Sequence, residues 1–478
     1  VLVEEGVNIN ISGGQVEYQD GYISTTQLLK DGELIDIADA DRNVSYDGLG
    51  GSYTITDEKW GVTETWQVNG ADTKARFEQG YIEGKDAGSL NISSNTLVME
   101  GNIDANVTSG TYQRDGSIDG SIGGHTSMPN GGSVIINLRN SGGAVQNAIF
   151  AEIIDPILKS YVTTPPATEF NPDLQLSTQM LKDSGLSNLT IDTYGDIDIN
   201  KGQEINLAAG ASLDLTGGRI NLDGNIKIIG GDVSLQAEYA TGKTADVTSV
   251  ILGGNAQIDV RGNWVNDTPE LNPEGAINSA IHIHGGDISL SASSGSTNEA
   301  FINLQQGSVI NASGGAWLQA DGKLKAGNGG NIAIAVDNPD ADSQIKIGGE
   351  LISAGITQGG NLKINADTIR ISDSDTNTEN ELVLTPDFFN KGGFGSYSLT
   401  AHRHGLAVDS GTVIDLIAQN LQLNNGYALQ QSGNSLEGMT ALITKPEWER
   451  GAVDLTLSVR KGDNTGAGDS LKWLSIGD

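Results

Sequence analysis

The chain has 478 residues, among them 65 glycines, 10 prolines and no cysteine, with a net charge of -34 and a pI near 4.3. This negative charge excludes an extended surface that binds the phosphates of nucleic acid or anionic lipid. The lack of thiols excludes disulfides and cysteine-ligated zinc. Aromatic residues make up 5% of the chain and apolar residues 37%, so we expect small, regularly spaced apolar residues to form the core. No apolar run is as long as a membrane helix, so we expect no membrane insertion.

The first portion, residues 1–144, is predicted to be β-helix with irregular, longer strands and loops. Residues 14–86 are richer in aromatic and charged residues and include KWGVTETW at 59–66. Their apolar positions alternate less regularly, so we expect longer strands and an excursion from the coil. Trp60 and Trp66 of this stretch, with Trp264 further along, are candidate platforms for a sugar ligand.

Residues 145–186 break the pattern and are predicted to form a helical and proline-rich connection. The stretch VQNAIFAEII at 145–154 has a short helical period. Pro156, Pro165, Pro166 and Pro172 follow it, and proline fits neither a helix interior nor a central strand. This connection is the best candidate for a boundary in the chain.

Residues 187–375 are predicted to form a regular β-helix. Triplets with apolar first and third positions start at Leu189, Ile197, Ile205, Leu213, Ile220, Ile226 and Val233. In an extended strand this pattern points two side chains inward and one outward, but strands of three residues are too short for isolated hairpins. Three such strands would make one rung of about 20 to 24 residues, and each would pair in parallel with its equivalent one rung later.

A longer repeat relates residues 176–207 to residues 384–416. The offset is 208 and becomes 209 after one inserted residue near His402. The first part of each copy carries an apolar pair, Met180-Leu181 or Phe388-Phe389, which predicts a short helix outside the coil. We therefore expect an extra-helical connection at 376–398 and the beginning of a second β-helix module at 399–478. The repeat aligns Gly185 with Gly393, Gly202 with Gly411, and Ile205 with Ile414.

Two histidines are the first candidate for a metal site. In IHIHG at 281–285, His282 and His284 share one side of a strand, and the two isoleucines take the inward positions. Two imidazoles at this spacing can chelate a transition metal. The sequence offers no third ligand, so exposed histidines without a metal are the simpler interpretation.

Two acidic stretches carry the alternating oxygen ligands that calcium prefers. Asp39 and Asp41 open DADRNVSYDG, and Asp373 and Asp375 open DSDTNTENE. Both stretches lack the sixth-position glycine and twelfth-position glutamate of an EF-hand loop, and turn capping by aspartate and asparagine explains them as well. Calcium stays an alternative, and no other cofactor is expected.

No catalytic residue is assigned, and an enzyme is not expected. Asp192, Asp196 and Asp198 would form a carboxylate ledge on the outer wall, where β-helical glycan lyases and hydrolases act. Such enzymes also need a partner acid or a basic residue, and aromatic platforms for sugar. The neighbourhood offers Arg219 and Lys227 but no tryptophan, and no Ser-His-Asp arrangement or phosphate-binding loop is visible.

The phrases GSVINASGG and AGNGGNIAIAV, between 307 and 336, resemble the repeats of filamentous haemagglutinin-like large exoproteins, the passengers of two-partner secretion. GYISTTQLLKDGELIDIADA, KWGVTETW and ARFEQGYIEGKDAGSLNI, between 21 and 92, resemble non-repetitive portions of the same class. The resemblance touches most of the chain. We find no NPNG-type or NPNL-type element of an amino-terminal secretion domain, which assigns this piece to the shaft.

The resemblance implies an all-β chain folded as a right-handed parallel β-helix with three short strands per rung and a few extra-helical helices and loops. It further implies export through a cognate outer-membrane pore, an extracellular location on the bacterial surface, and a structural role in cell adhesion. Expected partners are a glycan or protein on a host or neighbouring cell, with no nucleic acid. A self-assembling filament subunit and a carbohydrate-binding or carbohydrate-active β-helix are the alternatives.

Overall fold

The computed structural model describes residues 1–23, 26–41, 44–50, 52–67, 76–115, 126–139, 145–154, 171–239, 247–271, 280–294, 299–337, 343–374, 380–433, 436–460 and 473–476. These residues form two compact units. The stacked unit comprises Val1–Gly14 and Gly84–Asp478, and the small unit comprises Gln15–Glu83. Within the described ranges, no helix is long and apolar enough to cross a membrane.

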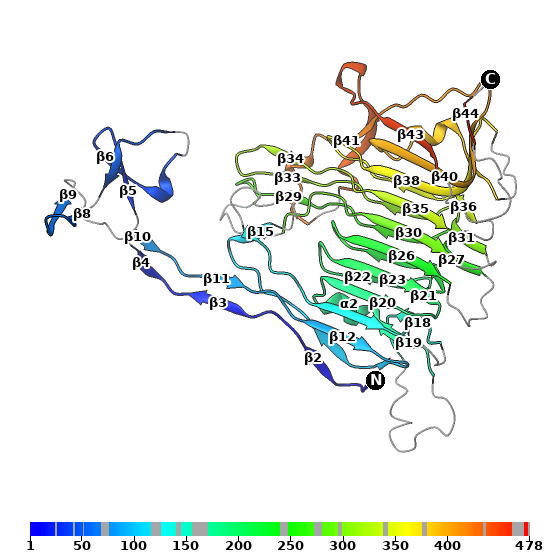
Figure 1. Cartoon of the computed structure of the whole chain (residues 1–478), viewed down its shortest axis with the longest axis horizontal. Helices are drawn as coiled ribbons and strands as arrows, with labels where there is room; N and C mark the ends of the chain where they lie inside the picture. Colours follow the sequence, from blue (N-terminus) through cyan, green and yellow to red (C-terminus); the bar gives the residue numbers. More distant parts are fainter. Residues whose placement is uncertain are drawn as a thin grey trace. The chain divides into compact units, whose positions relative to one another are not determined.

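Three long parallel sheets build the stacked unit (Figure 1). The large sheet contains, in spatial order, β12 (Ser89–Ser93), β17 (Ser133–Asn137), β20 (Asn188–Asp192), β23 (Ser212–Gly217), β26 (Asp232–Glu238), β30 (Ile288–Ser293), β35 (Ile332–Asp337), β38 (Asn361–Ile371), β40 (Ser396–Val408) and β43 (Asp454–Val459); β39 (Leu382–Leu384) and β44 (Trp473–Ile476) pair with β38 and β40. The second sheet contains β19 (Leu174–Ser177), β18 (Ala148–Ala151), β21 (Ile197–Ile199), β24 (Arg219–Leu222), β27 (Val247–Leu252), β31 (Glu299–Leu304) and β36 (Gln344–Ile347). The third contains β22 (Glu204–Asn206), β25 (Asn225–Lys227), β28 (Gln257–Asp259), β32 (Val309–Asn311) and β37 (Glu350–Ile352).

The chain visits these sheets in turn. Strands β20, β21 and β22 belong to the large, second and third sheets, and β23, β24 and β25 return to the same three. Because equivalent strands pair in parallel and in register, each rung lies directly on its predecessor. The prediction of an all-β chain with long parallel sheets is confirmed, and the arrangement is consistent with a β-solenoid.

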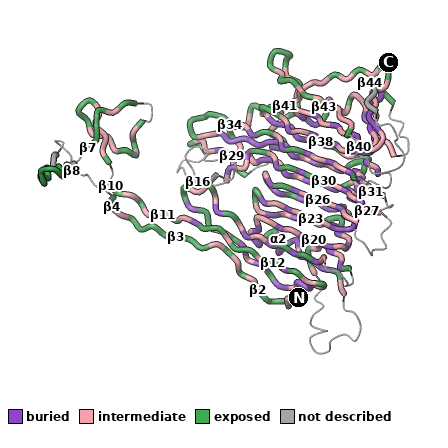
Figure 2. The backbone as a smooth tube through the Cα atoms, in the orientation of Figure 1, coloured by how far each residue is buried: buried purple, intermediate pink, exposed green. Residues whose placement is uncertain are grey.

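Stacked apolar side chains form the core of this unit. Alternate positions along most strands of the three long sheets are buried, as the banded tube in Figure 2 shows. In register, Leu189 lies beside Leu213, which lies beside Val233, and each is at most 1% exposed. The same ladder continues through Ile288, Ile332, Leu362 and Tyr397. The triplet pattern therefore identified the inward positions correctly.

Polar side chains also join successive rungs at the N-terminal ends of the large-sheet strands. Between β20 and β23, Asn188 Nδ2 donates to Ser212 Oγ at 2.7 Å. Between β26 and β30, the backbone N–H of Asp287 donates to Asp232 Oδ1 at 2.8 Å. Asn331 N donates in turn to Asp287 Oδ1 at 2.7 Å. These bonds run along the stack and reinforce the register set by the apolar ladder.

The second sheet contains one strand out of sequence order. β18 lies between β19 and β21, although it precedes both in the sequence, and it pairs with both in parallel. Gln146 supports this arrangement, because its buried side-chain amide donates to Leu97 O at 2.7 Å and to Pro172 O at 2.8 Å and accepts from Leu97 N at 2.9 Å.

The helical period predicted at the start of the 145–186 connection is wrong for β18. Ala148 and Phe150 are fully buried and the neighbouring positions are half-buried, which is the alternation of a strand. A short apolar run does not distinguish a buried strand from a helix by period alone. Pro156, Pro165 and Pro166 lie outside the described residues.

The two copies of the long repeat each contain a short helical segment near their start, an α-helix in the first and a 3-10 helix in the second. The helix α2 (Thr178–Asp183) buries Met180 and Leu181, and the 3-10 helix η2 (Pro386–Asn390) buries Phe389. The inserted residue near His402 lies in a bulge at 402–404. There, three residues of β40 lie opposite the single residue Asp367 of β38. The aligned glycines have matching positive φ, 71° for Gly185 and Gly393, and 86° and 84° for Gly202 and Gly411.

Smaller sheets flank the stack. They are β1 (Leu2–Val3) with β13 (Val98–Met99), β2 (Asn8–Asn10) with β14 (Asn102–Asp104), β15 (Gln113–Asp115) with β16 (Thr126–Ser127), β29 (Trp264–Asn266) with β33 (Ala316–Leu318) and β34 (Leu324–Ala326), and the antiparallel pair β41 (Gln419–Leu423) and β42 (Thr440–Thr444). Two further 3-10 helices are η3 (Tyr427–Leu429) and η4 (Glu447–Glu449).

The small unit lies in the segment where the sequence predicts longer strands, and most of its strand pairs are antiparallel. Its strands are β3 (Gln15–Tyr18) paired with β11 (Tyr81–Gly84), β4 (Gly21–Ile23) with β10 (Arg76–Glu78), β5 (Gln27–Lys30) with β6 (Glu33–Asp36) and β7 (Gly48–Gly50), and β8 (Ser52–Asp57) with β9 (Val62–Gln67). The 3-10 helix η1 (Ile37–Asp39) follows β6.

Candidate functional site

The small unit begins and ends with a narrow two-stranded ribbon that carries aromatic pairs. Tyr22 of β4 lies directly opposite Phe77 of β10, with their rings edge to face and the centroids 5.4 Å apart. Tyr18 of β3 stacks on Tyr81 of β11 with a centroid separation of 4.7 Å. We call these four residues the aromatic ribbon.

Three of the four rings of the aromatic ribbon are exposed, and that of Tyr81 is half-buried. Tyr22 is 73% exposed, Phe77 52% and Tyr18 44%. Aromatic side chains normally gain free energy by burial, so a row of exposed rings is a typical sign of a binding surface. The two pairs lie on successive strand pairs, β4 with β10 and β3 with β11, and are separated by four positions on each side of the ribbon, an even spacing that favours side chains on the same face.

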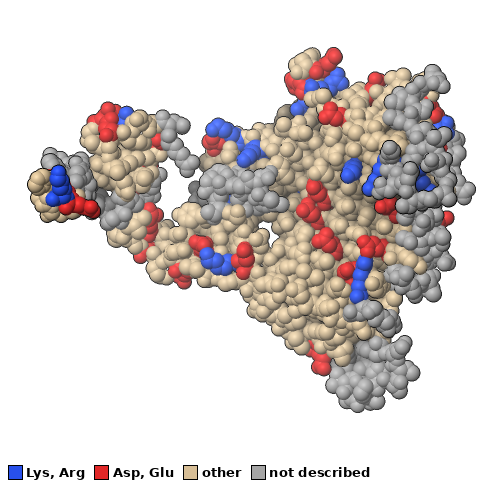
Figure 3. All heavy atoms as spheres, in the orientation of Figure 1, with Lys and Arg blue, Asp and Glu red and all other residues tan. Residues whose placement is uncertain are grey.

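The small unit is aromatic and acidic compared with the rest of the chain. Eight of the 24 aromatic residues of the chain fall within 15–83, together with fourteen acidic and five basic side chains. Carboxylates lie beside the aromatic ribbon: Asp20 Oδ1 accepts from Gly80 N at 2.6 Å, and Glu83 Oε2 accepts from the Tyr18 hydroxyl at 3.4 Å. On the face of the stacked unit that Figure 3 shows, acidic side chains are scattered among uncharged ones.

The three tryptophans predicted as sugar platforms have different environments. Trp60 lies in the turn between β8 and β9 and is 71% exposed, with the Lys59 ammonium 5.3 Å from its ring centroid. Trp66 lies in β9, and its side chain is outside the described part of the chain. The prediction is wrong for Trp264, which is fully buried and donates from Nε1 to Gln430 O at 3.0 Å. A ring without exposed surface offers no platform to a sugar.

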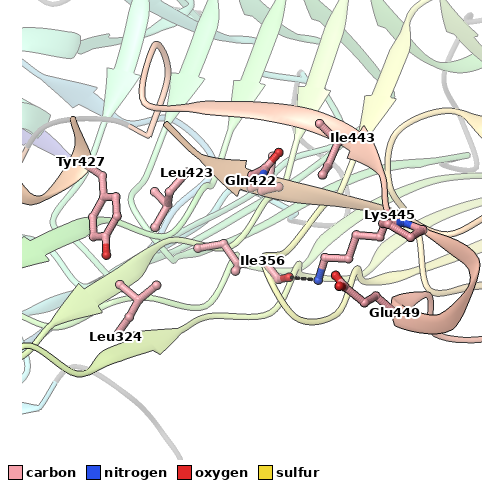
Figure 4. A pocket seen from close by; sticks show the side chains of 10 residues that line it. Leu324, Ile356, Gln422, Leu423, Tyr427, Ile443, Lys445 and Glu449 are labelled. Atoms are coloured by element: carbon pink, nitrogen blue, oxygen red, sulfur yellow. Dashed lines mark hydrogen bonds between the residues drawn. The ribbon is translucent and has the colours of Figure 1, made fainter. Parts of the chain in front are cut away.

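The stacked unit contains a groove of about 520 Å³ that the sequence did not indicate (Figure 4). Leu324 of β34, Ile356, Leu423 of β41 and Ile443 of β42 line its apolar part, and Tyr427 of η3 lies at one end. Lys445 and Glu449 lie at the other end, where Lys445 Nζ donates to Ile356 O at 3.4 Å. The groove is a second candidate binding surface.

The two candidate metal-binding histidines lie on the outer side of their segment. Ile281 and Ile283 are fully buried, His282 is half-buried and His284 is exposed. The His282 ring lies over Gly210, because a carbon added at that glycine would come within 2.6 Å of His282 Cε1. His284 Nδ1 accepts from Asn328 N at 3.1 Å. The structure therefore provides each imidazole with protein contacts.

The candidate calcium ligands lie in exposed turns. Asp39 ends η1, and the Asp41 carbonyl accepts from the Tyr46 hydroxyl at 3.2 Å. Asp373 is exposed, and Asp375 is outside the described residues. Over the described ranges, no group of three or more His, Asp or Glu side chains is arranged to hold a metal ion.

The carboxylate ledge predicted at Asp192, Asp196 and Asp198 is held by neighbouring side chains. Asp196 Oδ2 accepts from Arg219 at 2.5 Å, and Asp198 Oδ1 accepts from Asn221 Nδ2 at 2.8 Å. Asp192 pairs with Arg139, which also contacts Glu238. Burial raises the pKa of Asp192 above its ordinary value, although the Arg139 charge acts in the opposite direction. These two ion pairs and one hydrogen bond join neighbouring rungs.

Comparison of the chain with known protein families gives no matching family, and comparisons with curated proteins and with solved structures give no match either.

Proposed function

We propose that this chain is a structural and adhesive shaft segment of a secreted bacterial surface exoprotein, in which the stacked unit extends and presents the small unit. The observation that carries this proposal is the place where the small unit joins the stack. Lys85 N donates to Gly14 O at 2.9 Å, so the chain leaves and returns at one hydrogen-bonded pair. Ile11 and Gly13, just before it, bond to Asp104 and Asn106 of the next rung.

Stacking gives such a shaft its length and stability. Each rung of a right-handed parallel β-helix with three short strands adds about 4.8 Å along the axis. Its stability is close to the sum of the interactions between neighbouring rungs, because each rung contacts only its neighbours. A large unit of this kind carries a small binding unit away from the surface to which it is attached.

The composition supports an extracellular location on the bacterial surface. A chain without cysteine forms no disulfide while it crosses an oxidising compartment, which suits export through an outer-membrane secretion pore. The strong negative charge disfavours nucleic acid and anionic membranes as partners. A glycan or protein on a host or neighbouring cell is the expected partner.

A structural role is favoured over catalysis by the state of the carboxylates. Those of the ledge are engaged by Arg139, Arg219 and Asn221, whereas a hydrolase needs an acid and a base free to meet the substrate. Carbohydrate binding without catalysis is the second candidate, and the exposed aromatic ribbon favours it. This second role is compatible with the first.

The proposal is tested by display of the chain on a non-adherent bacterium. Adhesion to a panel of host-cell and bacterial layers is counted for the full chain and for a variant in which Gly14 is joined to Gly84. Antibody staining of the stacked unit controls for the amount displayed. The full chain should adhere and the shortened variant should not. Equal adhesion by both, or none by the full chain, would contradict the proposal.

A further inference from the structure

We infer that the aromatic ribbon binds a neutral, linear polysaccharide. This inference rests on the proposed function, because it takes the small unit as the surface that the shaft presents. The residues that carry it are the opposed pairs Tyr22 with Phe77 and Tyr18 with Tyr81.

The first argument is the chemistry of the exposed rings. The faces of an aromatic ring are electron-rich, and the C–H groups on the face of a sugar ring are weakly positive, so the two stack. Tyr22 and Phe77 are each more than half exposed and hold each other edge to face at 5.4 Å. Their orientation is thus set before a ligand arrives, which lowers the entropic cost of binding.

The second argument is the shape of the ribbon. Paired strands lie about 4.8 Å apart, whereas a stable protein–protein interface buries about 800 Å² on each partner. A two-stranded ribbon is too narrow to supply such an area. A linear polymer needs only a row of platforms, and Tyr18 and Tyr22 are about 13 Å apart along an extended chain.

The third argument is charge. The small unit has fourteen acidic and five basic side chains, and the carboxylates of Asp20 and Glu83 lie beside the aromatic pairs. They repel uronic acids and sulfated sugars. The same oxygens accept hydrogen bonds from sugar hydroxyls, so an uncharged polysaccharide gains contacts without electrostatic cost.

The experiment is native gel electrophoresis of the full chain through gels that contain a dissolved polysaccharide. The neutral probes are hydroxyethyl cellulose, galactomannan, xyloglucan and soluble starch. Carboxymethyl cellulose is the charged counterpart of the first probe, with the same backbone. Retardation by at least one neutral probe, and weaker retardation by carboxymethyl cellulose, is expected.

The double variant Tyr22→Ser with Phe77→Ser should weaken that retardation about tenfold, since removing aromatic stacking is typically worth up to this factor. Trp448→Ala is the matched control, because Trp448 is 83% exposed on the stacked unit. It should leave retardation unchanged. Antibody staining and circular dichroism confirm that each variant is folded.

Three results would overturn the inference: no retardation by any neutral probe, stronger retardation by carboxymethyl cellulose, or undiminished retardation of the double variant. If adhesion requires residues 15–83 but no gel retards the chain, the partner is a surface protein. The inference then fails while the proposed function stands. If the shortened variant still adheres, the proposed function fails independently of the gels.

Discussion

Arg114 and Asp267 form a buried, bidentate ion pair across 153 positions of sequence, with N–O distances of 2.5 and 2.6 Å. Their side chains are only 5% and 10% exposed. Trp317 Nε1 also donates to Asp267 Oδ2, at 2.7 Å. The pair therefore joins β15, which contains Arg114, to the small sheet of β29 and β33.

Removing one partner of this pair should be costly. Asp267→Asn removes the negative charge that faces the buried Arg114 guanidinium, so we expect a loss of about 3 kcal/mol in the free energy of unfolding. Chemical denaturation followed by circular dichroism measures it. The exposed pair of Asp321 with Lys323 is the control, and Asp321→Asn should cause no measurable change. Equal effects of both substitutions would contradict the structural role of the buried pair.

Asp214 should make stability depend on pH. Burial, with a smaller contribution from the Asp232 charge, raises the pKa of Asp214 above its ordinary value. A raised carboxyl pKa stabilises the folded chain while the group is protonated, and this stabilisation is lost as pH rises through the folded pKa. Asp214→Asn should therefore raise the unfolding temperature near pH 7 and have little effect near pH 3.

The pKa of Asp321 is shifted the other way, since a hydrogen bond from Lys323 lowers it. Its contribution is present above the ordinary pKa and is lost as pH falls through the folded value. Because the Asp321–Lys323 pair is exposed, this contribution is too small to measure, so thermal unfolding of Asp321→Asn between pH 3 and pH 7 should follow that of the unsubstituted chain, whereas Asp214→Asn should gain stability toward pH 7. A gain for Asp214→Asn that is as large near pH 3 as near pH 7 would refute the assignment.

The repeated glycines offer a matched pair of substitutions. Gly185 and Gly202 both have positive φ, which costs an alanine about 1 kcal/mol or more. A carbon added at Gly185 would also lie 2.7 Å from Asn106 Cα, whereas nothing lies within 4 Å of one added at Gly202. Gly185→Ala should therefore destabilise the chain clearly more than Gly202→Ala in a denaturant titration, and equal effects would show that the close approach is absent.

Much of the stacked unit follows from the sequence because its rungs repeat. The triplets between Leu189 and Val233 identified β20 to β26 and their inward residues, since the strand period of two is visible within three residues. The alignment of Gly185 with Gly393 matched two glycines that have equal φ values 208 positions apart. These features can be predicted because they depend on residues that are neighbours in the sequence or that repeat along it.

Features that depend on distant segments were not visible. Trp264 is buried because residues around Gln430 cover it from 166 positions away, and no local pattern reports that contact. β19 is inserted beside β18, although the sequence indicated only a connection there. The aromatic ribbon pairs Tyr22 with Phe77 across the excursion, and the weak alternation of 14–86 left that register undefined.

The stacking of rungs is tested most directly by engineered disulfides, since the native chain contains no cysteine. Ser234 of β26 lies directly opposite Ser289 of β30, 55 positions later in the sequence. Neighbouring parallel strands place such residues within the range of a disulfide, whereas Ser293 lies about 13 Å further along its strand. Mild oxidation should cross-link Ser234→Cys with Ser289→Cys and leave Ser234→Cys with Ser293→Cys open, as judged by gel mobility with and without reductant. Equal cross-linking of both pairs, or of neither, would contradict the in-register stack.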